Sequence, residues 1–256
     1  MRDPLASLYP PAARTLPTRR VGCIALVLAL TVATAGRADV DAPADAPAAA
    51  STANATHHDE VSLGATARAL RSPSANALTG ANLSGVSVGV ARDLGHDLGA
   101  SLLPGLTLWA EAGLVTGSAD GTMFQSLSTS IDELGLTGGL AARYRLHRRI
   151  TAGARVGFGA QRARVAITDG TGATAYDHGW GTMASAAAAL DVFLLTPPRF
   201  GLGLRLEAGY VAAQGIALTL HTDRPGDAIP LAMTELSIGH LDLGGPSAGL
   251  SLLGQF

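Results

Sequence analysis

The sequence of 256 residues has one cysteine, no lysine and few aromatic residues, which make up 4% of the chain. Its single cysteine, Cys23, cannot form a disulfide within the chain, so stability must come from packing or from the surroundings. No apolar stretch reaches the roughly 20 residues that a membrane-spanning helix needs. Phosphate-binding loops, zinc-ligand spacings and dinucleotide motifs are also missing, so we expect no cofactor and no metal, and we assign no catalytic residue.

The N-terminus combines positive charge with a short apolar run. Arg14, Arg19 and Arg20 precede the largely apolar residues 21–32, and small residues follow, with cleavage after Ala35 or Ala38 fitting equally well. This order is typical of a secretory signal peptide, which we predict over residues 1–38. Residues 39–58 are rich in Ala, Pro and Asp, and they predict a flexible periplasmic spacer.

The charge of the remaining chain is negative. From Asp39 onward there are 13 Arg and 19 Asp or Glu residues, a net charge of −6. A nucleic-acid-binding surface needs clustered basic residues, so this balance argues against a nucleic-acid partner.

From residue 59 to residue 256 the apolar residues recur with a period of two. Because successive side chains of a β-strand point to opposite faces, this alternation predicts strands. Eight segments show it: 60–70, 84–93, 106–115, 134–147, 150–161, 180–195, 200–210 and 247–256. The central part of each apolar face is uncharged, and the charged residues lie on the opposite face.

The lengths of the segments and of their connections favour a membrane barrel over a soluble one. Strands of about 9 to 12 residues match a tilted crossing of the bilayer. Two connections, 147–149 and 196–199, are short, whereas 117–133, 167–179 and 214–244 are long. Short turns on the periplasmic side and long loops outside are typical of outer-membrane barrels. The connection 93–105 is longer than this rule predicts, and a soluble barrel with its apolar face inward is the alternative.

The few aromatic residues fall at two levels of the predicted strands. Tyr144, Phe200 and Phe256 lie at the ends joined by short turns. Phe158, Trp180 and Tyr210 lie toward the long loops. Such rows match the interfacial girdles of membrane barrels.

The last strand carries the most specific motif. It alternates Leu250, Leu252 and Phe256 on one face, and it resembles the C-terminal signature of bacterial outer-membrane β-barrel proteins. The eight segments are similar to small OmpA/OmpX-type barrels. The resemblance implies a monomeric eight-stranded antiparallel transmembrane up-and-down β-barrel in a Gram-negative outer membrane, inserted by the barrel assembly machinery. If residues within 214–244 form their own strand pair instead of extending the last two strands, the count becomes ten.

The charged faces predict what fills the barrel. Eight strands enclose only enough space for side chains. Counting equal steps from the turn at 197–199 places Asp191 opposite Arg205, and other charged residues fall at similar depth. We predict a lumen charge network of Glu111, Arg143, Arg155, Asp191, Arg205 and Glu207. It could plug the barrel, or it could rearrange to gate a narrow ion path.

Two functional hypotheses follow. In the first, the protein has a structural or surface-interaction role, with Arg162 and Arg164 at the outer end of their strand in contact with lipopolysaccharide phosphates and outer-membrane lipid. In the second, it is a lipid-A-modifying enzyme that uses His178 or His221. Ser185 is predicted to point inward on its strand, and no serine lies at an obvious position beside His178.

Overall fold

The computed structural model describes residues 58–80, 82–95, 104–195, 200–222 and 235–256. Except for His58, the expected signal peptide and spacer lie outside the described residues. Within these ranges the elements are β1 (Asp59–Ala69), α2 (Pro73–Thr79), β2 (Asn82–Asp93), β3 (Leu106–Met123), β4 (Leu127–His147), β5 (Ile150–Thr168), β6 (Thr174–Leu195), β7 (Gly201–Ala213), β8 (Ile216–Thr222), β9 (Glu235–Leu241) and β10 (Gly245–Gln255).

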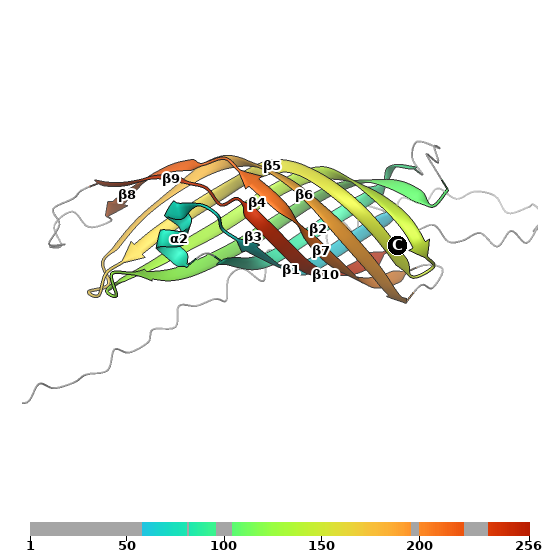
Figure 1. Cartoon of the computed structure of the whole chain (residues 1–256), viewed down its shortest axis with the longest axis horizontal. Coiled ribbons are helices and arrows are strands. Elements are labelled where there is room, and N and C mark those ends of the chain that lie inside the picture. Colours follow the sequence, from blue (N-terminus) through green and yellow to red (C-terminus); the bar gives the residue numbers. More distant parts are fainter. Residues whose placement is uncertain (1–57, 81, 96–103, 196–199, 223–234) are drawn as a thin grey trace, which may run out of the picture. The chain divides into compact units, whose positions relative to one another are not determined.

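Eight of the strands pair into a closed ring (Figure 1). Each strand from β1 to β7 pairs with the next, and β10 pairs with both β7 and β1. All these pairings are antiparallel, so the ring is an up-and-down barrel. We call the end with the C-terminus the terminal end and the end with α2, β8 and β9 the cap end. The eight-stranded antiparallel barrel expected from the alternation is confirmed.

The exterior of the ring is apolar over the length of a bilayer crossing. On β4, the outward side chains Leu136 and Leu140 are 62% and 46% exposed, whereas the inward Ala141 and Arg143 are buried. The eleven residues from Leu134 to Tyr144 match the roughly 9 to 11 of a tilted transmembrane strand. This exterior is that of a transmembrane barrel. No helix among the described residues is long and apolar enough to cross a membrane.

The two aromatic levels also lie on the exterior. At the cap side of the apolar surface, Phe158 and Trp180 are 72% and 64% exposed, and Tyr210 is 45% exposed. At the terminal end, Tyr144 and Phe256 are likewise exposed. The chain therefore presents aromatic rings at both boundaries of its apolar surface.

Two of the long connections are strands and not loops, which corrects the sequence expectation. Residues 117–133 continue β3 and β4 up to a turn around Phe124, and 167–179 continue β5 and β6 around Asp169. In the second turn, Asp169 accepts hydrogen bonds from the Thr171 hydroxyl and the Ala173 N–H. These hydrogen bonds hold the pKa of Asp169 below its ordinary value, and the bond from the Thr171 hydroxyl has the largest effect.

The polarity of the strands reverses beyond the membrane. On β5 the outward side chains change from Phe158 to Arg164, which is exposed, while Ala163 and Val165 on the inward face are fully buried. Lipid favours apolar exteriors and water favours apolar interiors. The cap end is therefore built like a soluble domain on top of a membrane barrel.

The interior of the cap end is filled by α2 and by apolar side chains of the wall, which here includes the β8–β9 hairpin. Residues 216–222 and 235–241 form a separate strand pair, which joins β6 through two residue pairs near Tyr176. β8 lies on the same edge of β6 as β7, after a break at residues 214–215, so the pair prolongs the wall beyond the ring, and the sheet has ten strands although its ring has eight. Leucines of the hairpin and of α2 share one apolar core with Ile131 and Val165 of the ring.

The sequence of α2 accounts for its limits. Pro73 occupies the first turn, where its missing N–H costs nothing, and Gly80 ends the helix with φ of 69°. Gly121 of β3 allows the helix to lie close, because a Cβ there would collide with the Leu78 carbonyl oxygen. That oxygen also accepts a hydrogen bond from the Thr129 hydroxyl of β4.

Candidate functional site

The lumen has three levels between the terminal end and the cap. The lowest is a group of ion-paired side chains, which we call the charge network, formed by Glu60, Glu111, Arg143, Arg155, Asp191, Arg205 and Glu207. Above it lies a cavity whose lining combines serine and threonine hydroxyl groups with apolar side chains. The highest is the ion pair Arg68–Glu133 beneath the apolar cap core.

Asp191 and Arg205 are opposite each other on β6 and β7, where the equal-step count places them. Arg205 donates from Nε to Asp191 Oδ1 at 2.6 Å and from Nη2 to Oδ2 at 2.8 Å. Nη2 also lies 3.0 Å from Glu60 Oε1. All three side chains are buried, and a buried charge persists only when such partners neutralise it.

Arg143 joins β4 to two other strands. Its Nη1 donates to Glu60 Oε2 at 2.7 Å, and its Nη2 donates to Glu111 Oε1 at 2.8 Å. The guanidinium carbon lies 4.4 Å from the centre of the Trp109 ring, which faces inward from β3. A flat guanidinium can use its edge for carboxylates and its face for an aromatic ring at the same time.

Arg155 completes the network on the side of β5. Its Nη1 donates to Glu207 Oε1 at 2.6 Å, and its Nε lies 3.2 Å from Glu111 Oε2. Glu111 therefore bridges Arg143 and Arg155, and it links the two halves of the network.

The structure brings together all six charged residues that the sequence suggested for the lumen. A seventh member, Glu60, was not predicted from the alternation; it is 2% exposed and contacts two of the three arginines. Gln255 Nε2 adds a hydrogen bond to Glu60 Oε2 at 2.9 Å. The inward parity of Glu60 was readable, but the residue begins its segment, where alternation says little about depth. With Gln255, seven of the eight ring strands contribute to one connected layer across the lumen.

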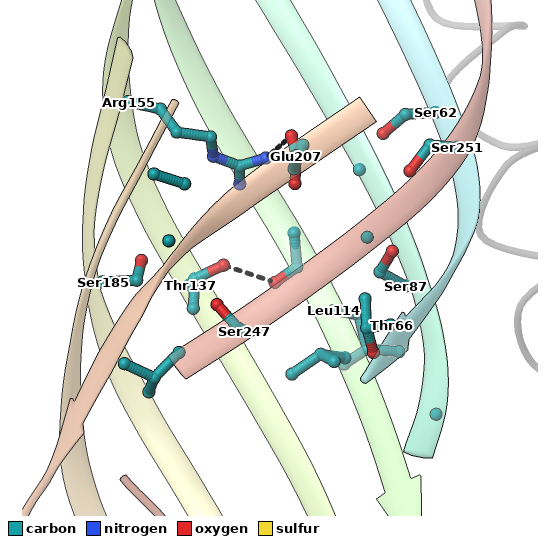
Figure 2. Close-up of a pocket in the computed structure, with 18 of the residues that line it drawn as sticks. Ser62, Thr66, Ser87, Leu114, Thr137, Arg155, Ser185, Glu207, Ser247 and Ser251 are labelled. Atoms are coloured by element: carbon teal, nitrogen blue, oxygen red, sulfur yellow. Dashed lines mark hydrogen bonds and ion pairs between the residues drawn. The ribbon is translucent and has the colours of Figure 1, made fainter. Parts of the chain in front are cut away.

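The middle level is a cavity of about 140 Å³. Its lining includes the hydroxyl groups of Ser62, Thr66, Ser87, Ser185, Ser247 and Ser251 (Figure 2). The Arg155–Glu207 pair borders it toward the network. A cavity with these hydroxyl groups suits several water molecules, and it is smaller than the roughly 300 Å³ at which ligand pockets begin.

The upper level is a second ion pair, which sequence analysis did not find because Glu133 fell within an expected loop. Arg68 Nη1 on β1 lies 2.9 Å from Glu133 Oε1 on β4 and donates to the Leu243 carbonyl at 3.1 Å. Glu133 is buried beside Gly117 and Gly135, whose lack of side chains leaves space for its carboxylate. The pair spans the lumen just below the cap core.

The candidate catalytic residues do not form a nucleophile–base pair in the described part of the chain. His178 and Ser185 point to opposite faces of β6, since His178 is exposed outside and Ser185 lines the cavity. His221 lies on β8, paired with Tyr176 of β6. Among the described residues, no group of three or more His, Cys, Asp or Glu side chains could hold a metal ion.

Arg162 and Arg164 lie on the exterior, within the extended β5 and not at its end as expected. Arg162 is paired with Leu134 and Trp180, at the cap-side aromatic level. Arg164 is paired one step further out with Asp132 and His178, and its guanidinium lies 5.3 Å from the centre of the Tyr176 ring.

The terminal strand places its motif residues on the lipid-facing side. Leu250, Leu252 and Phe256 are 51%, 52% and 44% exposed, while Ser251 between them is buried. The Phe256 backbone also closes the seam with β1, because its N–H donates to the Asp59 carbonyl at 3.0 Å and its carbonyl accepts from the Asp59 N–H at 3.1 Å.

Comparison with known proteins finds likeness at the level of solved structures. No protein-family model and no curated protein matches the chain. Ail, the attachment invasion locus protein of Yersinia pestis, is 9% identical over 78% of this chain and 98% of its own, with a TM-score of 0.39. The translocator domain of the autotransporter NalP from Neisseria meningitidis is 14% identical over 90% of this chain and 68% of its own, with a TM-score of 0.38. The barrel itself is established by the strand pairings of this chain.

Proposed function

We propose that the protein is a bacterial outer-membrane β-barrel with a closed lumen and a structural or surface-interaction role. The observation that carries the proposal is the charge network, which joins side chains from opposite sides of the ring at hydrogen-bonding distance. Because each carboxylate is held by at least one arginine, opening a path would separate several buried ion pairs at once.

Outer-membrane location is supported by three features of the exterior. These are its apolar band, its two aromatic levels and the outward Leu250, Leu252 and Phe256 of the terminal strand. We propose that this strand is read by the barrel assembly machinery. Phe256→Ala keeps the backbone seam bonds and removes only the ring, so it should lower the folded yield in cells if the ring is a signal. Normal yield of Phe256→Ala would limit the role of Phe256 to its backbone.

Contact with lipopolysaccharide is supported by the position of Arg162 and Arg164. They lie where the apolar exterior ends, beside Trp180 and Tyr176, and guanidinium groups at the edge of an apolar surface can bind lipid phosphates through paired hydrogen bonds. Added lipopolysaccharide should raise the unfolding temperature of the protein in detergent, and R162Q/R164Q should lose this gain. An equal gain in both proteins would place the contact elsewhere.

Conductance tests the closed lumen. Purified protein in a planar lipid bilayer should give no current steps above the baseline. A narrow gated ion path is the second candidate, favoured by the cavity between two sets of ion pairs. It predicts discrete current steps that become more frequent in Glu133→Gln, which weakens the Arg68–Glu133 pair.

A further inference from the structure

The turn between β4 and β5 concentrates positive charge at the terminal end. Arg145, Arg148 and Arg149 are all exposed, and His147 lies between them. Among the residues that the structure describes, none of the three guanidinium groups forms an ion pair with a carboxylate. Three cations within five residues repel one another, so an anion bound here would relieve an unfavourable arrangement.

Exposed apolar side chains lie beside these arginines on the outward face of β4, while Arg145 has the inward parity of Arg143 and lies exposed at the rim of the lumen. Tyr144, Leu146 and Ile150 are 49%, 59% and 36% exposed, and they belong to the same hairpin end. Tyr144 is also part of the terminal-end aromatic level. The arginines therefore lie at the boundary of the apolar surface, where lipid headgroups meet a membrane barrel.

The rest of the terminal end offers little negative charge to balance the turn. Its described side-chain carboxylates outside the charge network, Asp59 and Asp93, are already engaged, since Asp59 lies 3.7 Å from Arg92 and buried Asp93 accepts a hydrogen bond from the Gly95 N–H. At the cap end, by contrast, the outward faces expose Asp120 and Asp132. The cap end also carries arginines on its exterior, but there Arg164 is paired across the strands with Asp132, whereas the three arginines of the turn have no such carboxylate beside them in the part of the chain that the structure describes.

We propose that Arg145, Arg148 and Arg149 form a binding site for anionic phospholipid headgroups of the leaflet that faces the terminal end. A guanidinium binds a phosphate through two parallel N–H···O bonds, and three of them can bind more than one headgroup. The neighbouring Tyr144 and Leu146 favour a lipid over a soluble anion, because they contact acyl chains while the arginines contact phosphates. This site rests on the membrane location proposed above, but it is independent of any contact with lipopolysaccharide.

Tryptophan quenching by brominated lipids tests the site. The reporter is Tyr144→Trp in a Trp180→Phe background, which leaves Trp109 as the other tryptophan, buried in the lumen. The protein is inserted into vesicles of phosphatidylcholine and phosphatidylglycerol, in which one or the other lipid carries bromine. Brominated phosphatidylglycerol should be enriched about two- to fivefold around the reporter relative to its share of the vesicle. The enrichment should fall at about 1 M salt, where the Debye length is about 3 Å.

Two variants complete the test. R145Q/R148Q/R149Q should remove the enrichment, and R162Q/R164Q, which changes two arginines at the opposite aromatic level, should leave it intact. Insertion is measured separately, by the shift in gel mobility on boiling, so failure to enter the membrane is distinguished from loss of the site. Equal quenching by the two brominated lipids, or enrichment that resists salt, would overturn the proposal even if R145Q/R148Q/R149Q does not fold. Co-sedimentation with peptidoglycan that depends on the three arginines, without lipid enrichment, would assign the turn to the cell wall instead.

Discussion

Arg205 meets Asp191 through two parallel hydrogen bonds, of 2.6 and 2.8 Å, inside a barrel whose outer surface at the same strands is leucine. Such bidentate contact combines charge with a fixed orientation. The pair joins adjacent strands, and through Glu60 of β1 it is connected to Arg143 of β4 across the lumen. Polar groups thus bind the interior of this barrel together, and apolar groups face outward.

Removal of the Asp191 carboxylate should destabilise the barrel. Asp191→Ala leaves Arg205 buried with only part of its charge compensated, and breaking a buried pair costs about 3–5 kcal/mol. The lower end of that range is expected because Glu60 remains 3.0 Å away. Urea unfolding in liposomes gives the value, with Asp191→Asn as the milder control. A loss within about 0–1 kcal/mol, as for a pair facing water, would contradict the buried assignment.

A charge on the exterior should be costly for a different reason. Leu206 is 53% exposed and is paired with Leu190 and Leu250 on the lipid-facing side. Leu206→Arg should cost about 2–4 kcal/mol of unfolding free energy in liposomes, because it places a cation in hydrocarbon. The control Leu206→Met should cost less than about 1.5 kcal/mol. Similar values for the two variants would argue that this face is in water.

The contact between α2 and the ring should depend on Gly121. Gly121→Ala introduces a Cβ against the Leu78 carbonyl and the Thr79 Cα, so α2 must move or β3 must bend. Overpacking of this kind costs about 1–3 kcal/mol. Hydrogen exchange should accelerate in residues 73–79 and remain slow in the charge-network strands. Gly170→Ala, whose Cβ would meet nothing within 4 Å, should leave exchange in α2 unchanged.

Substitutions in the turn at the tip of β3 and β4 should stabilise the protein. Its central residues Phe124 and Gln125 have φ of 50° and 61°, the left-handed region that Asn and Gly adopt more readily. Phe124→Asn combined with Gln125→Gly should therefore raise the free energy of unfolding by about 1–2 kcal/mol. The measurement is urea unfolding, with Gln125→Ala as a variant that should give no gain. A double variant no more stable than the parent would show that this turn is not strained.

The membrane part of the fold was predictable because lipid imposes one polarity on every strand. Outward leucines, inward charges and the Asp191–Arg205 register all follow from alternation and from one short turn. Glu60 could be assigned to the inward face but not to a partner, because its arginines come from strands that are distant in the sequence.

The cap end was not predictable by the same rule, because the polarity reverses there. On β5 the apolar residues change face between Phe158, which points outward, and Val165, which points inward. A strand recognised by apolar residues on one face therefore ends, by that criterion, between these two positions. The seven residues of α2 are too few to establish a helical period. The extensions of β3 to β6 therefore read as loops, and for residues 214–244 the alternation did not decide between longer last strands and a separate strand pair.

Thiol labelling on intact cells tests the closed membrane barrel most directly. The wild type has no cysteine other than Cys23, which lies in the expected signal peptide, so the mature protein should give no background. Phe124 is 83% exposed at the tip of the cap end, and Ser87 lines the cavity between the charge network and Arg68–Glu133. A membrane-impermeant maleimide should label Phe124→Cys on intact cells and leave Ser87→Cys unlabelled until the protein is denatured. Labelling of Ser87→Cys in the folded protein would contradict the closed lumen, and an unreactive Phe124→Cys would contradict the exposure of the cap end outside the cell.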